Sequence, residues 1–257
     1  MSYYALKYHV ESHVAVIGPI APANSRRKVD NLAIELSDLC CQIGLGNDVR
    51  VFVLALANEK SFDNGEHSIR DIVLRNQGLE TTLLSCTKSI AQLNQPIIAA
   101  INGDTIGFAL ELALACDIRI ATDTAHFGFP HIKEGLIPWD GGTQRLSRVI
   151  GQAKAMEMVL TAANIKAEEA KEIGLVNKVV EPDKLISETR ALMEKILENA
   201  PLGISLAKYI IRSEREMPFH VGENYEAMTS ILTFLSKDGK EGMEAFFQKR
   251  EPSWSGT

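Results

Sequence analysis

One acidic side chain stands alone in an apolar row. Glu111 lies between Phe108 and Leu114, where every other residue is Phe, Ala or Leu. Burying a carboxylate in such a row costs several kcal/mol unless the group is paired or neutralised. Glu111 is therefore either a core acid with its hydrogen bonds satisfied or a group kept for proton transfer, with a pKa raised by desolvation.

Two further polar residues, His131 and Asp140, lie in one glycine-containing segment downstream. An imidazole titrates near neutral pH, so His131 is either an acid or base for catalysis or a hydrogen-bonded structural residue. Asp140 stands between Trp139 and a Gly-Gly pair. Its simplest role is to cap the helix that is predicted to start near Thr143.

The backbone around Gly107 is a third feature that could take part in catalysis. Asn102-Gly103-Asp104 and then Gly107 precede a predicted helix, whose first N–H groups and positive dipole end suit an oxyanion. Glycines at this place also serve turns without any chemistry. The residues 61–69, 101–111 and 127–144 all follow buried strands, where α/β sheets place ligand sites.

Apolar patterning predicts the elements that position these residues. Near-continuous apolar runs such as 49–57 are typical of parallel strands buried on both faces, and apolar residues three and four apart, as over 28–43, predict helices. Their alternation favours an α/β layer fold. The predicted strands are 13–19, 49–57, 96–101, 117–121 and 176–180, and the predicted helices are 28–43, 79–93, 107–116, 143–149, 153–160, 166–173, 182–199, 202–213, 221–235 and 239–248. We expect an α/β core over residues 1–190 and a helical C-terminal region over residues 191–257.

Composition narrows the class of protein. The 257 residues are 46% hydrophobic and carry a formal charge of −6, which suits one large core and gives no basic stripe for nucleic acid. The most apolar stretch, 96–116, contains Asn102, Asp104 and Glu111 and is not a membrane span. The four cysteines form no C-x-x-C pair, so no metal site is expected. Without a secretion signal, the expected location is cytoplasmic.

Several motifs in order resemble one family. Residues 49–69 resemble an apolar strand followed by A-F-x-A-G-x-D-I/L, and residues 96–117 resemble P-I/V-I-A-A-I/V-N-G-x-x-x-G-G-G-x-E-L/I-x-x-x-C-D. Residues 127–148 resemble F-x-x-P-E-x-x-x-G-I/L-x-P-x-x-G-G-T-Q-R-L-x-R, and residues 241–246 resemble E-G-x-x-A-F. Over nearly its whole length the chain resembles the crotonase superfamily, the enoyl-CoA hydratase/isomerase family.

The resemblance implies a fold, an assembly and a substrate. The fold is an α/β, crotonase-like (ClpP/crotonase) spiral of ββα turns with a helical C-terminal trimerisation region, assembled as a homotrimer or as a hexamer, a dimer of trimers. The substrate is an acyl-CoA thioester, with no cofactor beyond the coenzyme A that the substrate carries. The backbone N–H groups of Glu66 and Phe108 would form the oxyanion hole, and Glu66, His67, Ser68 and Ile69 would contact CoA, with Gly107 and Trp139 also at the substrate.

The sequence departs from the family pattern at the centre of that site. A hydratase of this family uses two glutamates, of which Glu111 is the first, and His131 replaces the second. The family's Gly-Gly-Gly is Gly107-Phe108-Ala109, a small pair is replaced by Trp139-Asp140, and His67 replaces an Asp. The two bulky rings suggest a cyclic, branched or short acyl group.

These features predict a lyase that adds water to an enoyl-CoA or removes it. Glu111 would activate water or move a proton, and His131 and Asp140 would act as auxiliary acid/base groups. Isomerisation, hydrolysis or decarboxylation of an acyl-CoA by the same enolate stabilisation is the alternative. An acyl-CoA-binding protein that has lost catalysis is the alternative outside the enzyme class.

Overall fold

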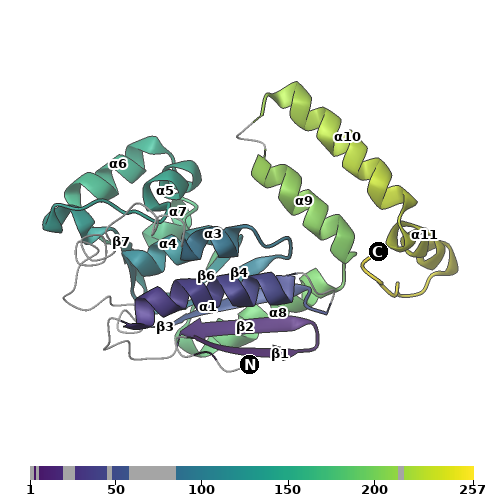
Figure 1. The fold of residues 1–257 in the computed structure, drawn as a ribbon, viewed down its shortest axis with the longest axis horizontal. Helices are drawn as coiled ribbons and strands as arrows, with labels where there is room; N and C mark the ends of the chain where they lie inside the picture. The colour runs from purple at the N-terminus through teal and green to yellow at the C-terminus, as the bar shows by residue number, and fades with distance from the viewer. Residues whose placement is uncertain (1–2, 4–5, 20–26, 45–47, 58–84, 214–216) are drawn as a thin grey trace.

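A six-stranded sheet forms the centre of the molecule (Figure 1). The computed structural model describes residues 3, 6–19, 27–44, 48–57, 85–213 and 217–257. The strand order is β1-β2-β3-β4-β6-β9, in which β1 is antiparallel to β2 and all other pairs are parallel. The strands are β1 Leu6–Glu11, β2 Val14–Pro19, β3 Val51–Ala57, β4 Ile97–Asn102, β6 Ile118–Thr122 and β9 Lys178–Val180.

A second, three-stranded sheet has the order β5-β7-β8 and lies beside the first. It consists of β5 Thr105–Ile106, β7 His126–Gly128 and β8 Ile165–Lys166. The pair β5–β7 is parallel and the pair β7–β8 is antiparallel. Since β5 follows β4 after only two residues and leads into the next helix, this small sheet fixes the place where that helix begins.

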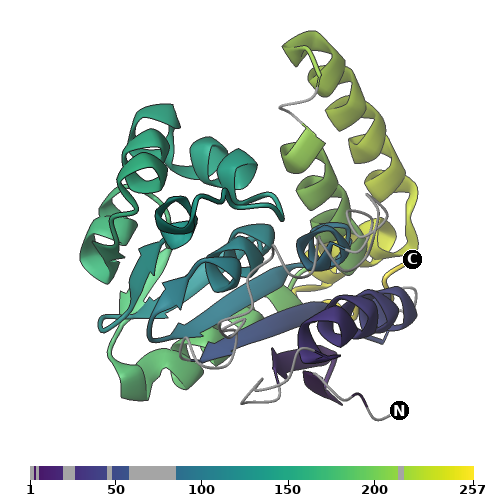
Figure 2. The ribbon, with the colours of Figure 1, turned by 60° about the vertical axis from the view of Figure 1, so that its left-hand side comes forward.

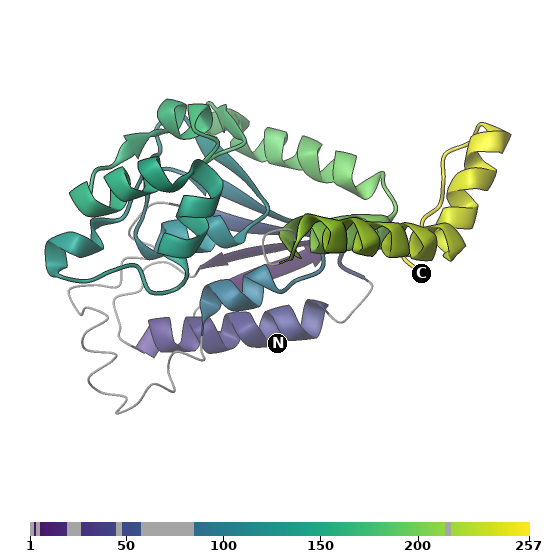
Figure 3. The same ribbon diagram turned by 90° about the horizontal axis from the view of Figure 1, so that it is seen from above.

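Helices cover both faces of the large sheet (Figure 3). Side chains alternate along a strand, so Val51, Ile98 and Ile120 pack against α8 on one face, while Phe52, Leu54 and Ala99 join the larger cluster on the other. The helices of the core are α1 Arg27–Gly44, α3 Cys86–Ala91, α4 Phe108–Ala115, α5 Gly142–Ile150, α6 Gln152–Thr161, α7 Ala167–Glu172 and α8 Leu185–Leu197, with 3-10 turns η3 Pro130–Glu134 and η4 Pro182–Lys184.

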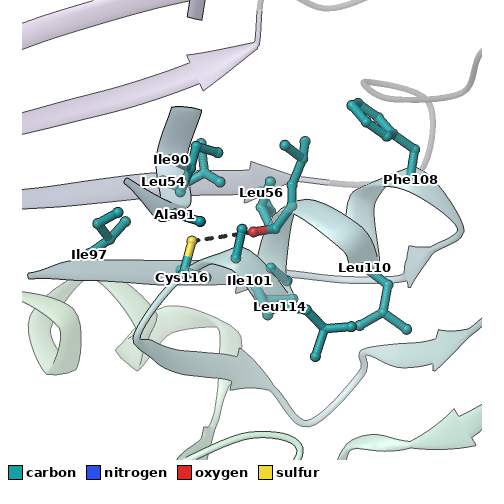
Figure 4. Close-up of a cluster of buried hydrophobic side chains, with 14 of the residues drawn as sticks. Leu54, Leu56, Ile90, Ala91, Ile97, Ile101, Phe108, Leu110, Leu114 and Cys116 are labelled. Atoms are coloured by element: carbon teal, nitrogen blue, oxygen red, sulfur yellow. Dashed lines mark hydrogen bonds between the residues drawn. The ribbon is translucent and has the colours of Figure 1, made fainter. Parts of the chain in front are cut away.

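The larger core cluster surrounds α4. All eight residues of α4 are buried. Figure 4 shows side chains of α4 beside those of α3, β3 and β4. At the end of α4 the Cys116 thiol donates to the carbonyl of Leu112 at 3.4 Å. Glu111 is thus held on a helix that cannot shift without disturbing the core.

Three C-terminal helices extend away from the sheet (Figure 2). They are α9 Pro201–Ser213, α10 Phe219–Leu235 and α11 Lys237–Gln248. None of the residues of α9 or α10 is buried within this chain, and α10 exposes Met228, Ile231, Leu232 and Leu235, the spacing of one helical face. Across the described part of the chain, no helix has the length and apolarity needed to cross a bilayer.

The pattern-based predictions hold for most of the core. The observed β2, β3, β4, β6 and β9 and the helices α1, α4 and α5 to α11 fall within or close to the predicted ranges. Of the helix predicted over 79–93, residues 86–91 are helical and 79–84 lie outside the described residues. Strands β1, β5, β7 and β8 were not predicted. The predicted boundary after residue 190 falls inside α8 and stays a prediction.

Candidate active site

The turn before α4 is built on Gly107. This residue has φ +60°, a conformation that glycine adopts without steric cost. Its N–H donates to the carbonyl of Gly128 at 2.9 Å, and its own carbonyl accepts from the N–H of Glu111 at 3.1 Å. The chain therefore enters α4 abruptly at Gly107, and Phe108 is the first residue of the helix.

Glu111 is fully buried, and its two carboxylate oxygens differ. Oε1 accepts hydrogen bonds from the N–H of Asp140 at 2.8 Å and of Gly142 at 3.0 Å. Oε2 is buried and has no hydrogen-bond partner among the described residues. One oxygen is therefore fixed by the backbone, and the other is left for a proton or a ligand.

The backbone can approach Glu111 this closely because residue 142 is a glycine. A Cβ on this residue would lie 2.8 Å from Glu111 Oε1 and 2.8 Å from Pro138 Cβ. Real Cβ atoms essentially never approach so closely. The second glycine of the Gly-Gly pair is thus required by Glu111 itself.

Burial raises the pKa of Glu111 to about 7, and this is the largest influence on it. The two N–H donors and the charge of Arg145 lower the pKa, while the negative charge of Asp140 raises it. A carboxyl group that titrates near neutral pH can take up and release a proton during one turnover. Only one of the two carboxylate oxygens is satisfied by hydrogen bonds, an arrangement that is compatible with proton transfer.

His131 lies next to the same turn. Its Cε1 would be 3.5 Å from a Cβ on Gly107, and its ring centroid is 5.8 Å from that of the buried Phe129. The Nδ1 atom is buried and has no hydrogen-bond partner within the described chain. Burial lowers the pKa of His131 from its usual value, against the opposing charge of Glu134, and so favours the neutral ring.

Glu111 and His131 both lie near Gly107: the backbone N–H of Glu111 donates to its carbonyl, and the His131 ring lies on the side where a Cβ would be. Each presents a buried polar atom without a protein partner in the described residues. Buried polar atoms in folded proteins are nearly always hydrogen-bonded. Two such atoms beside one helix N-terminus indicate a place where a polar ligand is handled.

Unlike Glu111 Oε2 and His131 Nδ1, the Asp140 carboxylate has hydrogen-bond partners in the described chain. Asp140 is buried, and its carboxylate accepts from the Ser85 hydroxyl, the Thr87 N–H at 3.1 Å and the Thr87 hydroxyl at 2.8 Å. The helix cap predicted for it is wrong, because α5 begins after Gly141 with no side-chain cap. The carboxylate instead binds the first turn of α3, while the backbone N–H binds Glu111.

The two bulky rings differ in exposure. Phe108 is buried in the main cluster at the start of α4, whereas Trp139 is 38% exposed and its neighbour Ile137 is 65% exposed. The predicted donor Glu66 and the predicted CoA contacts His67, Ser68 and Ile69 lie outside the described residues. Within the described ranges, no group of three or more His, Cys, Asp or Glu residues is arranged to hold a metal ion.

The sequence does not predict the hydrogen bonds that residues of α3 and α5 make with the loop before α5. Ser85, Thr87 and Arg145 all reach the loop before α5, and none of them was singled out as a site residue. Ser85 and Asp140 are separated by 55 residues. A Ser-x-Thr pair at a helix start signals a cap, but not its distant partner.

Comparison with known proteins identifies relatives of the whole chain. The family model for enoyl-CoA hydratase/isomerase matches residues 29–257. The short-chain-enoyl-CoA hydratase of Clostridium acetobutylicum is 36% identical over 94% of each chain, and the (E)-benzylidenesuccinyl-CoA hydratase of Thauera aromatica is 36% identical over 96% of this chain and 97% of its own. A solved enoyl-CoA hydratase from Bacillus anthracis has a TM-score of 0.85 at 32% identity, covering 99% of this chain and 100% of its own.

The fold and the half-satisfied buried glutamate define an enzyme of the crotonase type. The chain belongs to the enoyl-CoA hydratase/isomerase family.

Proposed function

We propose that this enzyme adds water across the double bond of an enoyl-CoA thioester, or removes it in reverse, with Glu111 moving the proton. The observation that carries the proposal is the asymmetry of the Glu111 carboxylate. Oε1 is fixed by two backbone N–H groups, and Oε2 is buried without a hydrogen-bond partner among the described residues.

The chemistry of hydration then uses one carboxylate twice. In its ionised form Glu111 takes a proton from water through Oε2, as the water oxygen bonds to C3 of the enoyl group. The electron pair of the double bond passes to the thioester as an enolate. Glu111 returns the proton to C2, so that one water is added and the enzyme is regenerated.

His131 takes the position of the second family glutamate in this proposal. Its unpartnered Nδ1 is a hydrogen-bonding atom for the reacting water, as donor or acceptor according to the tautomer. A neutral ring can hold and orient the water without competing with Glu111 for the proton. We assign it an orienting role and leave the proton transfer to Glu111.

The oxyanion hole belongs to the same proposal. The N–H of Phe108 is the first donor of α4, at the positive end of the helix dipole. Together with the N–H of Glu66, it would stabilise the negative charge that develops on the thioester oxygen. Residues 66–69 would also hold the CoA portion of the substrate.

A short, branched or cyclic acyl group suits the residues that replace small ones in the family pattern. Phe108 fills space at the start of α4, and Trp139 and Ile137 present apolar surface beside the loop that binds Glu111. The relative from Thauera aromatica is named for a benzylidenesuccinyl-CoA, a branched aromatic acyl group. This supports testing aromatic and branched substrates alongside short ones.

Isomerisation is a second candidate, because one observation favours it. Moving a double bond needs one group that takes a proton from one carbon and returns it to another, and Glu111 is the one buried carboxylate with an unpartnered oxygen in the described chain. Hydration changes the substrate mass by one water and isomerisation does not. Mass spectrometry of products from short, branched and cyclic enoyl-CoA substrates therefore separates the two.

The proposal extends to assembly and location. A homotrimer, or a dimer of trimers, is supported by the large apolar side chains that α9 to α11 expose, such as Phe219 and Phe247 at 82% and 81%. A cytoplasmic location is supported by relatives such as the bacterial hydratase from Clostridium acetobutylicum. Sedimentation and cell fractionation test these two points.

A further inference from the structure

We propose that Asp140 is a positioning residue, whose carboxylate ties the loop that binds Glu111 to the start of α3 and so holds Glu111 in place for proton transfer. This inference rests on the proposed role of Glu111. It assigns to Asp140 a function through another residue rather than contact with the substrate.

The carboxylate of Asp140 is engaged by donors from the start of α3. Its Oδ1 accepts from the Ser85 hydroxyl and, at 2.8 Å, from the Thr87 hydroxyl, and its Oδ2 accepts from the Thr87 N–H at 3.1 Å. The residue is 4% exposed. A buried carboxylate with three donors is held in one orientation.

Arg145 closes the arrangement from α5. One guanidinium nitrogen donates to the Thr87 hydroxyl at 2.8 Å and to the Asp140 carbonyl at 2.9 Å. The guanidinium lies where a side chain on Gly141 would be, since a Cβ there would stand 2.1 Å from it. We call Ser85, Thr87, Asp140 and Arg145 the brace, because it joins α3 and α5 through the loop between Trp139 and Gly142.

The brace ends at Glu111. The same Asp140 whose side chain is fixed on α3 donates its backbone N–H to Glu111 Oε1 at 2.8 Å. Gly142, two residues later, donates the second hydrogen bond. If the loop moved, both donors would leave Oε1, and a displacement of about 1 Å at a catalytic group can lower a rate by up to about 100-fold.

Asp140 affects the pKa of Glu111 in two ways, through its own charge and through the N–H donors that it holds in place, and other charged and titratable groups also surround Glu111. They are Arg145 of α5, His131 of η3 and the Cys86 thiol of α3. The Asp140 charge raises the pKa of Glu111, whereas the two N–H donors that the brace holds lower it. Removing only the charge lowers that pKa, and releasing the loop raises it.

The experiment compares Asp140→Asn, Asp140→Gly and Thr87→Val with the wild type. Asn removes the charge and keeps an acceptor for the two hydroxyls, but it replaces the acceptor of the Thr87 N–H by an NH2 group. Gly removes the whole side chain of Asp140 from the brace, and Val removes the Thr87 hydroxyl at nearly constant volume. The control is Asp117→Asn, a part-buried aspartate at the far end of α4 that pairs with Lys208. Readouts are kcat and KM for hydration and the titration of Glu111 by infrared difference spectroscopy of Cδ-labelled glutamate, with the band assigned by Glu111→Gln.

For Asp140→Gly and Thr87→Val we expect kcat to fall about tenfold or more with KM nearly unchanged, and the titration midpoint of Glu111 to rise. Asp140→Asn should lower the midpoint and reduce kcat less than Asp140→Gly. A midpoint that is unchanged or lower in Thr87→Val, with kcat as in the wild type, overturns the positioning role. Since the infrared titration needs no turnover, it still decides the question for a wild-type enzyme that hydrates none of the substrates, whereas that result alone would refute the proposed function.

Discussion

Among single residues, Glu111 is the most important, because its carboxylate lies where solvent cannot stabilise its charge. Glu111 is fully buried, and two backbone N–H groups compensate only one of its oxygens. Its pKa of about 7 is the direct result of that environment. Such a pKa suits the proposed proton transfer, and the burial that causes it lowers the stability of the folded state, as is common at active sites.

This cost has a definite pH dependence. In the native state Glu111 has a pKa of about 7 against a model value of 4.5, so between these values the folded chain binds more protons than the unfolded one. The contribution of Glu111 to stability therefore falls as pH rises from about 4.5 to about 7. We expect Glu111→Gln to be more stable than the wild type at pH 8, by up to about 3 kcal/mol, with a smaller difference at pH 5.

Urea unfolding at the two pH values measures this directly. The control is Glu181→Gln, an exposed residue just before η4, which should show no growth of the difference with pH. An advantage of Glu111→Gln that stays constant between pH 5 and pH 8 would contradict the assigned ionisation.

At the scale of elements, the close approach of a loop to α4 makes Gly142 indispensable. Gly142→Ala would bring a Cβ to 2.8 Å from both Glu111 Oε1 and Pro138 Cβ. We expect a loss of about 1 to 3 kcal/mol in the free energy of unfolding and a decrease in kcat, because the loop must move away from Glu111.

The matched control for this prediction is Gly18→Ala in β2, where an added Cβ would find nothing nearer than 3.9 Å. Thermal unfolding and steady-state kinetics on both variants check it. If the two substitutions changed kcat equally, the close approach of Gly142 to Glu111 would not contribute to the catalytic rate.

The sequence predicts elements well where burial dictates composition. The apolar run of β3 and the apolar row of α4 are recognisable because both are enclosed on all sides. Strand β1 was missed because five of its six residues are at least partly exposed and its sequence resembles a polar surface segment. Strand β7 was missed because three residues carry no period.

The site was predictable to a similar, partial degree. Glu111 stands out because a lone acid in an apolar helix requires an explanation. The role of Asp140 could not be predicted, since its partners Ser85 and Thr87 are more than 50 residues away along the chain, separated by 55 and 53 positions. Its residue type is compatible with a helix cap, but its carboxylate accepts hydrogen bonds from Ser85 and Thr87 at the start of α3, whose N-cap is Ser85.

Over the whole molecule, the C-terminal helices leave many large apolar side chains exposed. Helix α10 exposes Met228, Ile231 and Leu232 on consecutive turns, and Phe219 and Phe247 are more than 80% exposed. Exposed apolar surface of this extent is typical of an interface between protein chains. The proposed trimer would bury it.

We expect sedimentation equilibrium to give three or six times the chain mass of 28.3 kDa. Ile231→Glu should dissociate the assembly, because it introduces a charge into an apolar contact. Ser187→Glu, an equal charge change at an exposed position of α8, serves as the control. A wild-type protein that sediments as a monomer at micromolar concentration would contradict the proposed assembly.

The proposed role of Glu111 is to move the proton in the hydration of an enoyl-CoA. The most direct measurement follows the product of a short enoyl-CoA in ¹⁸O-labelled water by mass spectrometry, with wild type and Glu111→Gln compared at equal concentration. The account predicts a mass gain of one labelled water with the wild type and a rate at least about 100-fold lower with Glu111→Gln. Product formed by Glu111→Gln at the wild-type rate would contradict it.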